Sequence, residues 1–141
     1  YLDVKLHPII ADAGGLFDIK SPRVVMAGAH VDIEDYEMFI TDFSSFVFDF
    51  ACLCRPVLYF VPDYGQFKAG MNHYRELDLP FEKAFGPLVL DPDGAVEEIK
   101  KAAENGFDPE PIYAERMRSF FYPLENCAEA LYNEVSSWEL K

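Results

Sequence analysis

Alternation of apolar and polar positions predicts a chain that passes repeatedly between short strands and helices. Strand-like segments, rich in β-branched, aliphatic and aromatic residues, are predicted at Leu2–Leu6, Arg23–Met26, Met38–Thr41, Pro56–Phe60 and Leu88–Leu90. The continuous apolar character of Met38–Thr41 is typical of a buried strand. Pro56 can open its strand because proline is tolerated at a strand's first position.

Helical segments are predicted between and after these strands. Their expected places are Asp32–Glu37, Ser44–Leu53, a helix following the turn at Asp91–Gly94, Pro111–Phe120 and Leu124–Trp138. Residues 63–85 mix glycine, proline, aromatic and charged residues without a clear period. We expect them to form a long loop with one short helix, and such loops are usually functional or mobile.

The order of these elements predicts the fold class. Strand, helix and strand alternate through the centre, which is typical of an open parallel α/β sheet flanked by helices. The chain has 141 residues and half of them are hydrophobic. That is enough for one domain with a substantial core, so we expect a single domain over residues 1–141.

The charge balance narrows the classes of partner. The chain carries 25 acidic and 12 basic residues, a formal net charge of −13, which argues against nucleic-acid binding and against adhesion to anionic lipid. No apolar segment approaches the roughly 20 residues of a spanning helix, and the chain does not begin with a basic leader. We therefore expect a soluble cytoplasmic domain that does not insert into a membrane.

Cysteine and histidine usage gives no support to a metal site or a cofactor. Cys52, Cys54 and Cys127 are odd in number and lack the paired spacing of a zinc site, so we interpret them as reduced thiols. No two histidines share a ligand spacing, and the carboxylates are dispersed.

Hydroxyl side chains gather where one predicted strand passes into a helix. Thr41, Ser44 and Ser45 lie there, close to backbone N–H groups that have no partner inside a helix and to the positive end of its dipole. A phosphate or diphosphate placed there would receive several hydrogen bonds. The alternative is that Ser44 or Ser45 merely caps the helix, and residue chemistry alone favours capping.

The wider pattern resembles a known family. The residues that carry the resemblance are Thr-Asp-Phe-Ser-Ser, then Phe-Asp-Phe-Ala, then Arg55–Phe60. With them, the centre of the chain resembles the C-terminal half of the CDP-glycerol glycerophosphotransferases, which build poly(glycerol phosphate) and related wall teichoic acid chains. Three further segments match the family pattern in the same order along the chain: Lys5–Pro8, Phe85–Val89 and Phe120–Pro123. The resemblance covers most of the chain and implies the Rossmann-like, nucleotide-binding half of a two-domain GT-B type transferase. The chain, which starts without Met, is then expected to be a fragment of a larger enzyme.

The resemblance also implies the chemistry. The donor is CDP-glycerol, and the reaction moves glycerol phosphate to the hydroxyl end of a polymer acceptor and releases CMP. The family's general base, a histidine, belongs to the N-terminal half, and no segment here resembles that motif. We therefore expect donor binding without turnover, with no cage for a divalent ion. The acceptor would be bound through the other half, in a parent enzyme peripheral to the inner face of the cell membrane.

Individual residues receive roles from this resemblance and from the rule that ligands bind beyond the carboxyl ends of parallel strands. His7 is expected to contact the diphosphate, stabilising developing charge or protonating the CMP leaving group; alternatively it hydrogen-bonds to backbone at a strand end. Asp49, four residues after Ser45, would orient that hydroxyl or hold a ligand hydroxyl, unless it only favours the helix dipole. His30 follows a strand end and is a weaker candidate for the same cleft.

The pattern departs from the family near its end. The family often shows Asp-Asp-Gly followed by a basic residue and a later arginine, whereas Leu124–Leu131 contains neither basic residue. A related polyol-phosphate or sugar-nucleotide transferase therefore stays open. So does a non-enzymatic α/β module whose acidic surface meets a protein partner, although that leaves the central motif unexplained.

Overall fold

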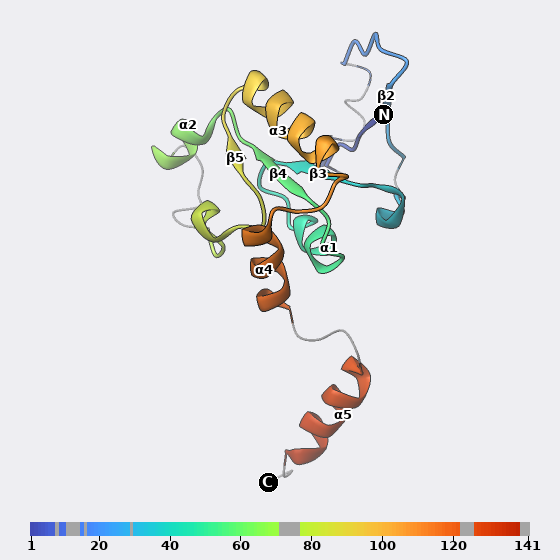
Figure 1. Cartoon of the computed structure of the whole chain (residues 1–141), viewed down its shortest axis with the longest axis vertical. Coiled ribbons are helices and arrows are strands. Elements are labelled where there is room, and N and C mark those ends of the chain that lie inside the picture. Colours follow the sequence, from blue (N-terminus) through green and yellow to red (C-terminus); the bar gives the residue numbers. More distant parts are fainter. Residues whose placement is uncertain are drawn as a thin grey trace. The chain divides into compact units, whose positions relative to one another are not determined.

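The computed structural model describes residues 1–7, 9–10, 15, 17–28, 30–70, 77–121 and 126–138. The chain divides into two compact units, Tyr1–Asp35 and Tyr36–Lys141. Every strand pair within the described ranges is parallel. The predicted α/β fold with parallel strands and flanking helices is confirmed (Figure 1).

The first unit contains a two-stranded parallel sheet. β1 (Leu2–Val4) pairs with β2 (Val24–Met26), with Leu2 opposite Val24. The strand predicted to reach Leu6 is therefore shorter. The predicted helix at Asp32–Glu37 is also shortened, to a single 3-10 turn at Ile33–Asp35, where the Asp32 carboxylate accepts the N–H of Glu34 at 3.2 Å.

The second unit contains a three-stranded sheet in the order β3–β4–β5. The strands are β3 (Phe39–Thr41), β4 (Val57–Phe60) and β5 (Leu88–Val89), with Phe39 opposite Val57 and Tyr59 opposite Leu88. The predicted strand from Pro56 begins one residue later, at Val57, so Pro56 lies immediately before β4. The Pro56 carbonyl still accepts the N–H of Phe39 at 2.9 Å, while the proline nitrogen has no hydrogen to donate.

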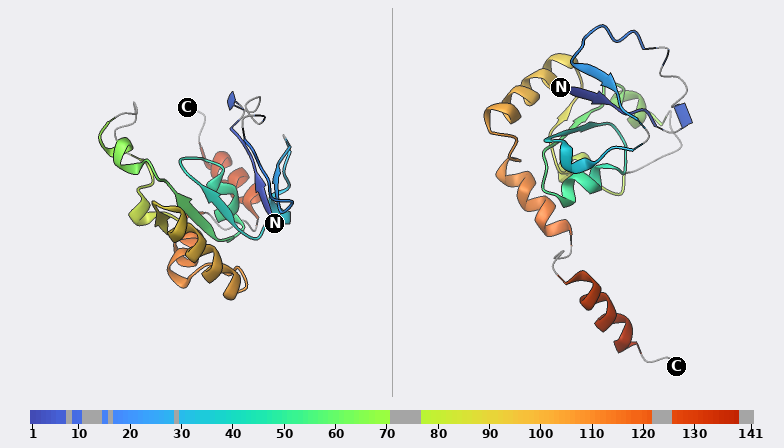
Figure 2. Two further views of the ribbon diagram at one scale, coloured as in Figure 1. Left: turned by 90° about the horizontal axis from the view of Figure 1, so that it is seen from above. Right: turned by 90° about the vertical axis from the view of Figure 1, so that its right-hand side faces the viewer.

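Five helices accompany this sheet among the described residues. They are α1 (Val47–Cys52), α2 (Tyr64–Lys68), α3 (Pro92–Glu104), α4 (Pro111–Phe120) and α5 (Cys127–Ser137). α1 contacts β3, β4 and α4, and α3 contacts β4 and β5 (Figures 1 and 2). The most deeply buried large side chains, Leu58, Val61, Phe85 and Met117, come from β4, its continuation, the segment before β5 and α4.

The helix predictions hold to different extents. α4 begins and ends at the predicted residues, and Asp91 caps α3 by accepting the Gly94 N–H at 2.9 Å. Residues 71–76 and 122–125, which include part of the predicted loop and the start of the last predicted helix, lie outside the described residues. None of the helices that the structure describes is long and apolar enough to cross a membrane.

The prediction of a helix from Ser44 was wrong in its first turn. α1 begins at Val47, and Ser44 and Ser45 lie in the turn before it. The Ser44 hydroxyl accepts the N–H of Phe46 at 3.2 Å, and this local bond offers the backbone an alternative to a helical turn. No side chain caps α1.

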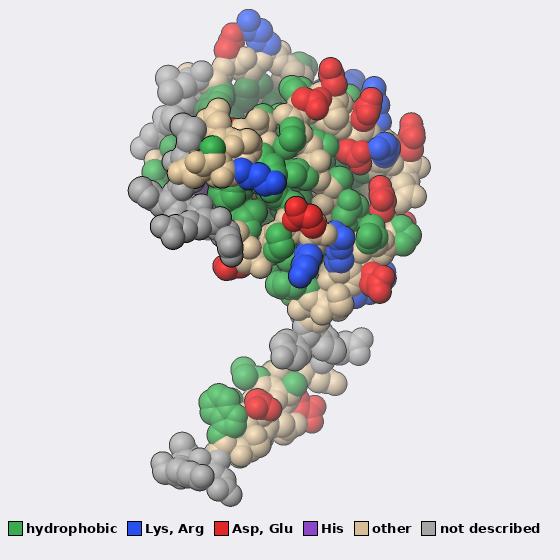
Figure 3. Space-filling model, turned by 90° about the vertical axis from the view of Figure 1, so that its left-hand side faces the viewer, with side chains coloured by type: hydrophobic (Ala, Val, Ile, Leu, Met, Phe, Trp, Pro, Cys, Tyr) green, Lys and Arg blue, Asp and Glu red, His purple; other side chains and the backbone are tan. Residues whose placement is uncertain are grey.

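Figure 3 shows the side of the structure on which α2 lies. Hydrophobic side chains gather on this face, with acidic and basic side chains both among them and around them.

Gly86 is required by a close approach between two chain segments. A Cβ atom at this buried position would overlap the carbonyl oxygen and carbon of Val57, the first residue of β4. Because the obstacle is backbone, it cannot rotate aside as a side chain would.

We predict that Gly86→Ala lowers the free energy of unfolding by about 1–3 kcal/mol, the usual range for overpacking. Urea unfolding at neutral pH measures this. Gly65→Ala is the matched control, since a Cβ there meets open space and alanine favours the helix. Equal stability of the two variants would contradict the steric argument.

Cys54 lies just beyond the end of α1, after the C-cap residue Leu53, and adopts a left-handed conformation with φ of 53°. The N–H of Cys54 donates to the Ala51 carbonyl and that of Arg55 to the Phe50 carbonyl, each at 3.0 Å. These two bonds form a Schellman motif, in which glycine is the usual residue at the Cys54 position.

We predict that Cys54→Gly raises the free energy of unfolding by about 0.5–1 kcal/mol relative to Cys54→Ala, because glycine adopts positive φ without a Cβ penalty. The alanine variant also lacks the thiol, so the comparison isolates the backbone effect. Thermal unfolding of both variants under reducing conditions measures it, and a less stable glycine variant would refute it.

Candidate functional site

The carboxyl ends of β3 and β4 bring the predicted hydroxyl residues to one edge of the three-stranded sheet. Thr41 is the last residue of β3 and lies opposite Tyr59. Its side chain is buried, whereas Asp42, Phe43 and Ser45 in the following turn are exposed. Thr41, Ser44 and Ser45 therefore belong to one short turn at the edge where parallel α/β sheets bind ligands.

The turn presents hydrogen-bond donors that the protein does not use. Among the described residues, the backbone N–H groups of Phe43, Ser44 and Ser45 have no acceptor, and the Ser45 hydroxyl has no partner. The Ser44 hydroxyl is engaged as the acceptor of the Phe46 N–H. Adjacent unpaired amides with a hydroxyl beside them can together bind an anion.

Asp49 is exposed in the first turn of α1, and its N–H donates to the Phe46 carbonyl at 3.2 Å. Since α1 begins only at Val47, Ser45 is not part of the helix. The helical spacing that linked the Asp49 carboxylate to the Ser45 hydroxyl is therefore absent. The contact of Asp49 with a ligand hydroxyl stays a prediction.

His7 and His30 belong to the first unit, and both are exposed. The backbone contact expected as the alternative role of His7 is present, since its Nδ1 accepts the N–H of Ile9 at 3.2 Å. A neutral imidazole bonded in this way carries its proton on Nε2, where it can be donated. Protonation of Nδ1 would break the bond to Ile9. No hydrogen bond of the His30 side chain occurs within the described residues.

Aromatic residues beside the turn were not expected to belong to the site. We define the edge aromatic cluster as Phe43, Tyr59, Tyr64, Phe67 and Phe81. The rings of Phe43 and Phe67 stack with centroids 4.6 Å apart and an interplanar angle of 23°. Lys68, at the end of α2, places its Nζ 4.8 Å from the centroid of the Tyr64 ring.

The sequence contained only a partial signal for this cluster. Phe43 lies within the Thr-Asp-Phe-Ser-Ser pattern, whereas Tyr64, Phe67 and Phe81 come from the region that has no period. They meet because α2 follows β4 and the 3-10 helix precedes β5. Lys68 supplies a cation on the element next to the turn.

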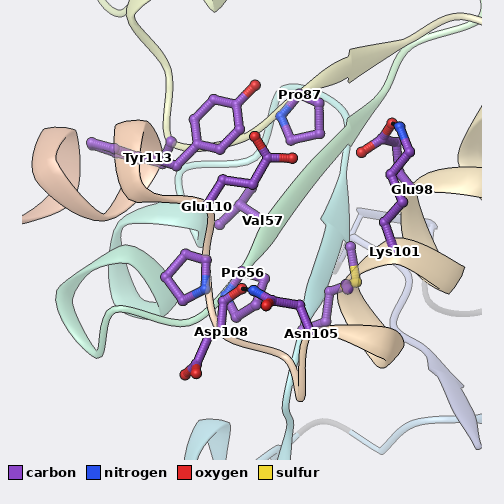
Figure 4. A pocket seen from close by; sticks show the side chains of 13 residues that line it. Pro56, Val57, Pro87, Glu98, Lys101, Asn105, Asp108, Glu110 and Tyr113 are labelled. Atoms are coloured by element: carbon purple, nitrogen blue, oxygen red, sulfur yellow. Dashed lines mark hydrogen bonds and ion pairs between the residues drawn. The ribbon is translucent and has the colours of Figure 1, made fainter.

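A cavity of about 270 Å³ lies at the other edge of the same sheet. Its walls include Met38, Pro56 and Pro87, which come just before β3, β4 and β5, and Glu98 and Glu110 lie around it (Figure 4). Burial and the Glu110 carboxylate raise the pKa of the Tyr113 phenol there. Since this is the amino edge of the sheet, we do not assign the phosphate site to this cavity.

No cluster of three or more potential metal ligands occurs in the part of the chain that the structure describes. Cys52, Cys54 and Cys127 are not in disulfides there.

Comparison with known proteins gives consistent matches. The family model for CDP-glycerol:poly(glycerophosphate) glycerophosphotransferase matches residues 2–136. The teichoic acid poly(glycerol phosphate) polymerase of Bacillus spizizenii (strain ATCC 23059 / NRRL B-14472 / W23) is 39% identical over 105 residues, covering 71% of this chain and 26% of the relative. The protein of the same name from Bacillus subtilis (strain 168) is 44% identical over 66 residues, covering 46% and 8%.

A solved structure supports the same fold. The wall teichoic acid polymerase TagF superposes with a TM-score of 0.59 at 19% identity, covering 96% of this chain and 34% of that one. The chain thus spans about a third or less of the proteins that it matches.

Tyr59, a member of the edge aromatic cluster, carries a buried polar atom. Tyr59 is 5% exposed, and its hydroxyl makes no well-formed hydrogen bond among the described residues. Burial raises the pKa of the phenol, and the nearby backbone of Phe85 only partly opposes that rise. A buried hydroxyl without a partner is destabilising, and one whose pKa is raised destabilises the fold further at alkaline pH. The reason is that the phenol of the unfolded chain has the ordinary pKa of 10 and therefore loses its proton at a lower pH than the phenol of the folded chain.

We predict that Tyr59→Phe raises the free energy of unfolding at neutral pH by up to about 1 kcal/mol. It also reduces the loss of stability above about pH 10. Urea unfolding at both pH values measures this. Tyr132→Phe, on the exposed face of α5, is the control and should change neither quantity. A destabilised Tyr59→Phe at neutral pH would mean that the hydroxyl is satisfied.

Proposed function

Because the chain belongs to the CDP-glycerol:poly(glycerophosphate) glycerophosphotransferase family, we propose that it is the donor-binding part of a transferase that uses CDP-glycerol. In this proposal, glycerol phosphate passes to a teichoic-acid-type polymer, and CMP leaves. The observation that carries it is the Thr41–Ser45 turn, which combines the family's motif with unused donors at the carboxyl edge of the sheet.

The diphosphate would be held chiefly by neutral donors. The N–H groups of Phe43, Ser44 and Ser45 and the Ser45 hydroxyl provide several hydrogen bonds, and bonds to a charged acceptor are the stronger kind. α1 has only six residues, so its dipole adds a modest contribution. Ser44 contributes its N–H and shapes the turn through the bond from Phe46.

The net charge of −13 opposes the approach of an anionic donor. Local cations are therefore needed, and Lys68 is the one that we place near the phosphates. In this proposal, Lys68 supplies the positive charge that basic residues of the family supply near the end of the pattern, where Leu124–Leu131 has none. The contact of His7 with the diphosphate stays a prediction from the family resemblance, and the imidazole Nδ1 accepts the N–H of Ile9.

Turnover would require more than these residues. Our proposal includes a general base and an acceptor site outside this chain, consistent with its coverage of about a third or less of its relatives. The intact transferase would then act on the cytoplasmic side of the membrane. Two alternative functions predict other ligands. A sugar-nucleotide transferase would bind a different nucleotide at the turn, and a protein-interaction module would bind a protein partner.

We predict that CDP or CDP-glycerol shifts the amide NMR signals of Phe43–Val47 in a saturable way, with uridine nucleotides weaker. Replacing both serines by alanine should lower the affinity about tenfold or more, because removing a hydrogen bond to a charged group costs about 1.5–3 kcal/mol. The single Ser45→Ala variant is the sharper test, since the Ser45 hydroxyl has no structural bond within the described residues.

Ser119→Ala is the matched control, because that serine is exposed on α4 and bonds only to the Arg116 carbonyl. Its binding should equal that of the unaltered chain. Absence of any saturable shift at millimolar CDP would refute the proposed function. Preference for uridine nucleotides would instead support the sugar-nucleotide alternative.

A further inference from the structure

Resting on the proposed function, we propose that Phe43 is the stacking surface for the nucleobase of the donor. Phe43 is 38% exposed. Its neighbours in the chain are Asp42, which carries a carboxylate, and Ser44, which carries a hydroxyl. An aromatic ring left partly open beside phosphate-binding amides fits a ligand that joins an anion to a flat ring. A nucleoside diphosphate is such a ligand.

The ring is held in place from behind. Phe67, only 8% exposed, stacks on Phe43 with centroids 4.6 Å apart, and Phe81 lies at 6.0 Å with a tilt of 47°. Tyr64 in turn stacks on Phe67 at 6.2 Å. Packed against buried rings, Phe43 loses little rotamer freedom when a base stacks on it, so most of the stacking energy is available for binding.

The position along the chain also fits. Phe43 is the first of three consecutive residues whose N–H groups have no acceptor in the described part of the chain. In a nucleoside diphosphate the ribose separates the base from the phosphates by one sugar ring. A side chain that extends from the same turn as the amides can therefore meet the base while those amides hold the phosphates.

Stacking has a specific consequence for selectivity. Every base has a π-face, so an aromatic platform raises affinity without distinguishing cytosine from uracil. Phe43 is thus expected to strengthen CDP and UDP by the same factor. Inorganic pyrophosphate, which carries the anion and no base, should gain nothing from it.

The experiment uses the 141-residue chain and three probes, CDP, UDP and pyrophosphate, with calorimetry for affinity. Phe43→Leu keeps an apolar side chain but removes the π-face, and Phe43→Tyr keeps both. Phe120→Leu is the control, since Phe120 is 50% exposed and stacks on Phe48 in a different aromatic group. Thermal unfolding of each variant establishes that it is folded.

We expect Phe43→Leu to weaken CDP and UDP about tenfold, in line with base stacking on aromatic side chains, and to leave pyrophosphate binding unchanged. Phe43→Tyr should restore both nucleotides, and Phe120→Leu should alter none of the three. Proton NMR gives a second readout: the cytosine ring protons should move upfield on binding, and the movement should shrink in Phe43→Leu.

The outcomes separate this inference from the proposed function. If the unaltered chain binds CDP no more tightly than pyrophosphate, stacking is refuted while an anion site remains. If Phe43→Leu weakens all three probes equally, Phe43 only shapes the turn, and the inference falls. If the unaltered chain binds none of them, the proposed function and the inference fall together.

Discussion

Parallel pairing of β3 with β4 is the constraint from which the site follows. The Phe39 N–H bonds the Pro56 carbonyl in this pair, and the Tyr59 N–H bonds the Pro87 carbonyl where β4 pairs with β5, both at 2.9 Å. Parallel register forces the strands to end on one edge, so the turn after Thr41 and helix α2 after β4 emerge side by side there. Hydroxyls, amides, rings and Lys68 come from separate stretches of chain and are brought together by this ladder.

The sequence predicted most of the elements because their signals are local. Pro111–Phe120 has a proline at its first turn and was placed correctly, and the apolar strands were found within a residue or two. The start of α1 was missed because a bond from the Phe46 N–H to the Ser44 hydroxyl competes with the first helical turn. Residue preference alone cannot tell which of these two local arrangements wins.

The candidate site was predictable only in part, for a physical reason. Thr41, Ser44 and Ser45 are close in sequence, so a pattern can reveal them. Phe43 and Phe67 stack on each other although they are 24 residues apart in the sequence, and no local pattern encodes that contact. The need for glycine at position 86 is equally non-local, since it arises from the approach of Val57.

The net charge of −13 explains why this site would bind phosphate through uncharged amides and hydroxyls. A cluster of arginines would bind a diphosphate tightly, yet the carboxylates of a chain with 25 acidic residues could neutralise it. Amides and hydroxyls carry no net charge to be neutralised. Hydrogen bonds of this kind are short-ranged and directional, so they select the geometry of the phosphates more than their charge. The cavity at the amino edge has the opposite character, because three acidic residues, Glu98, Asp108 and Glu110, line it with one cation, Lys101, which is already paired with Glu98. Charge and strand direction both favour the turn after Thr41 over that cavity.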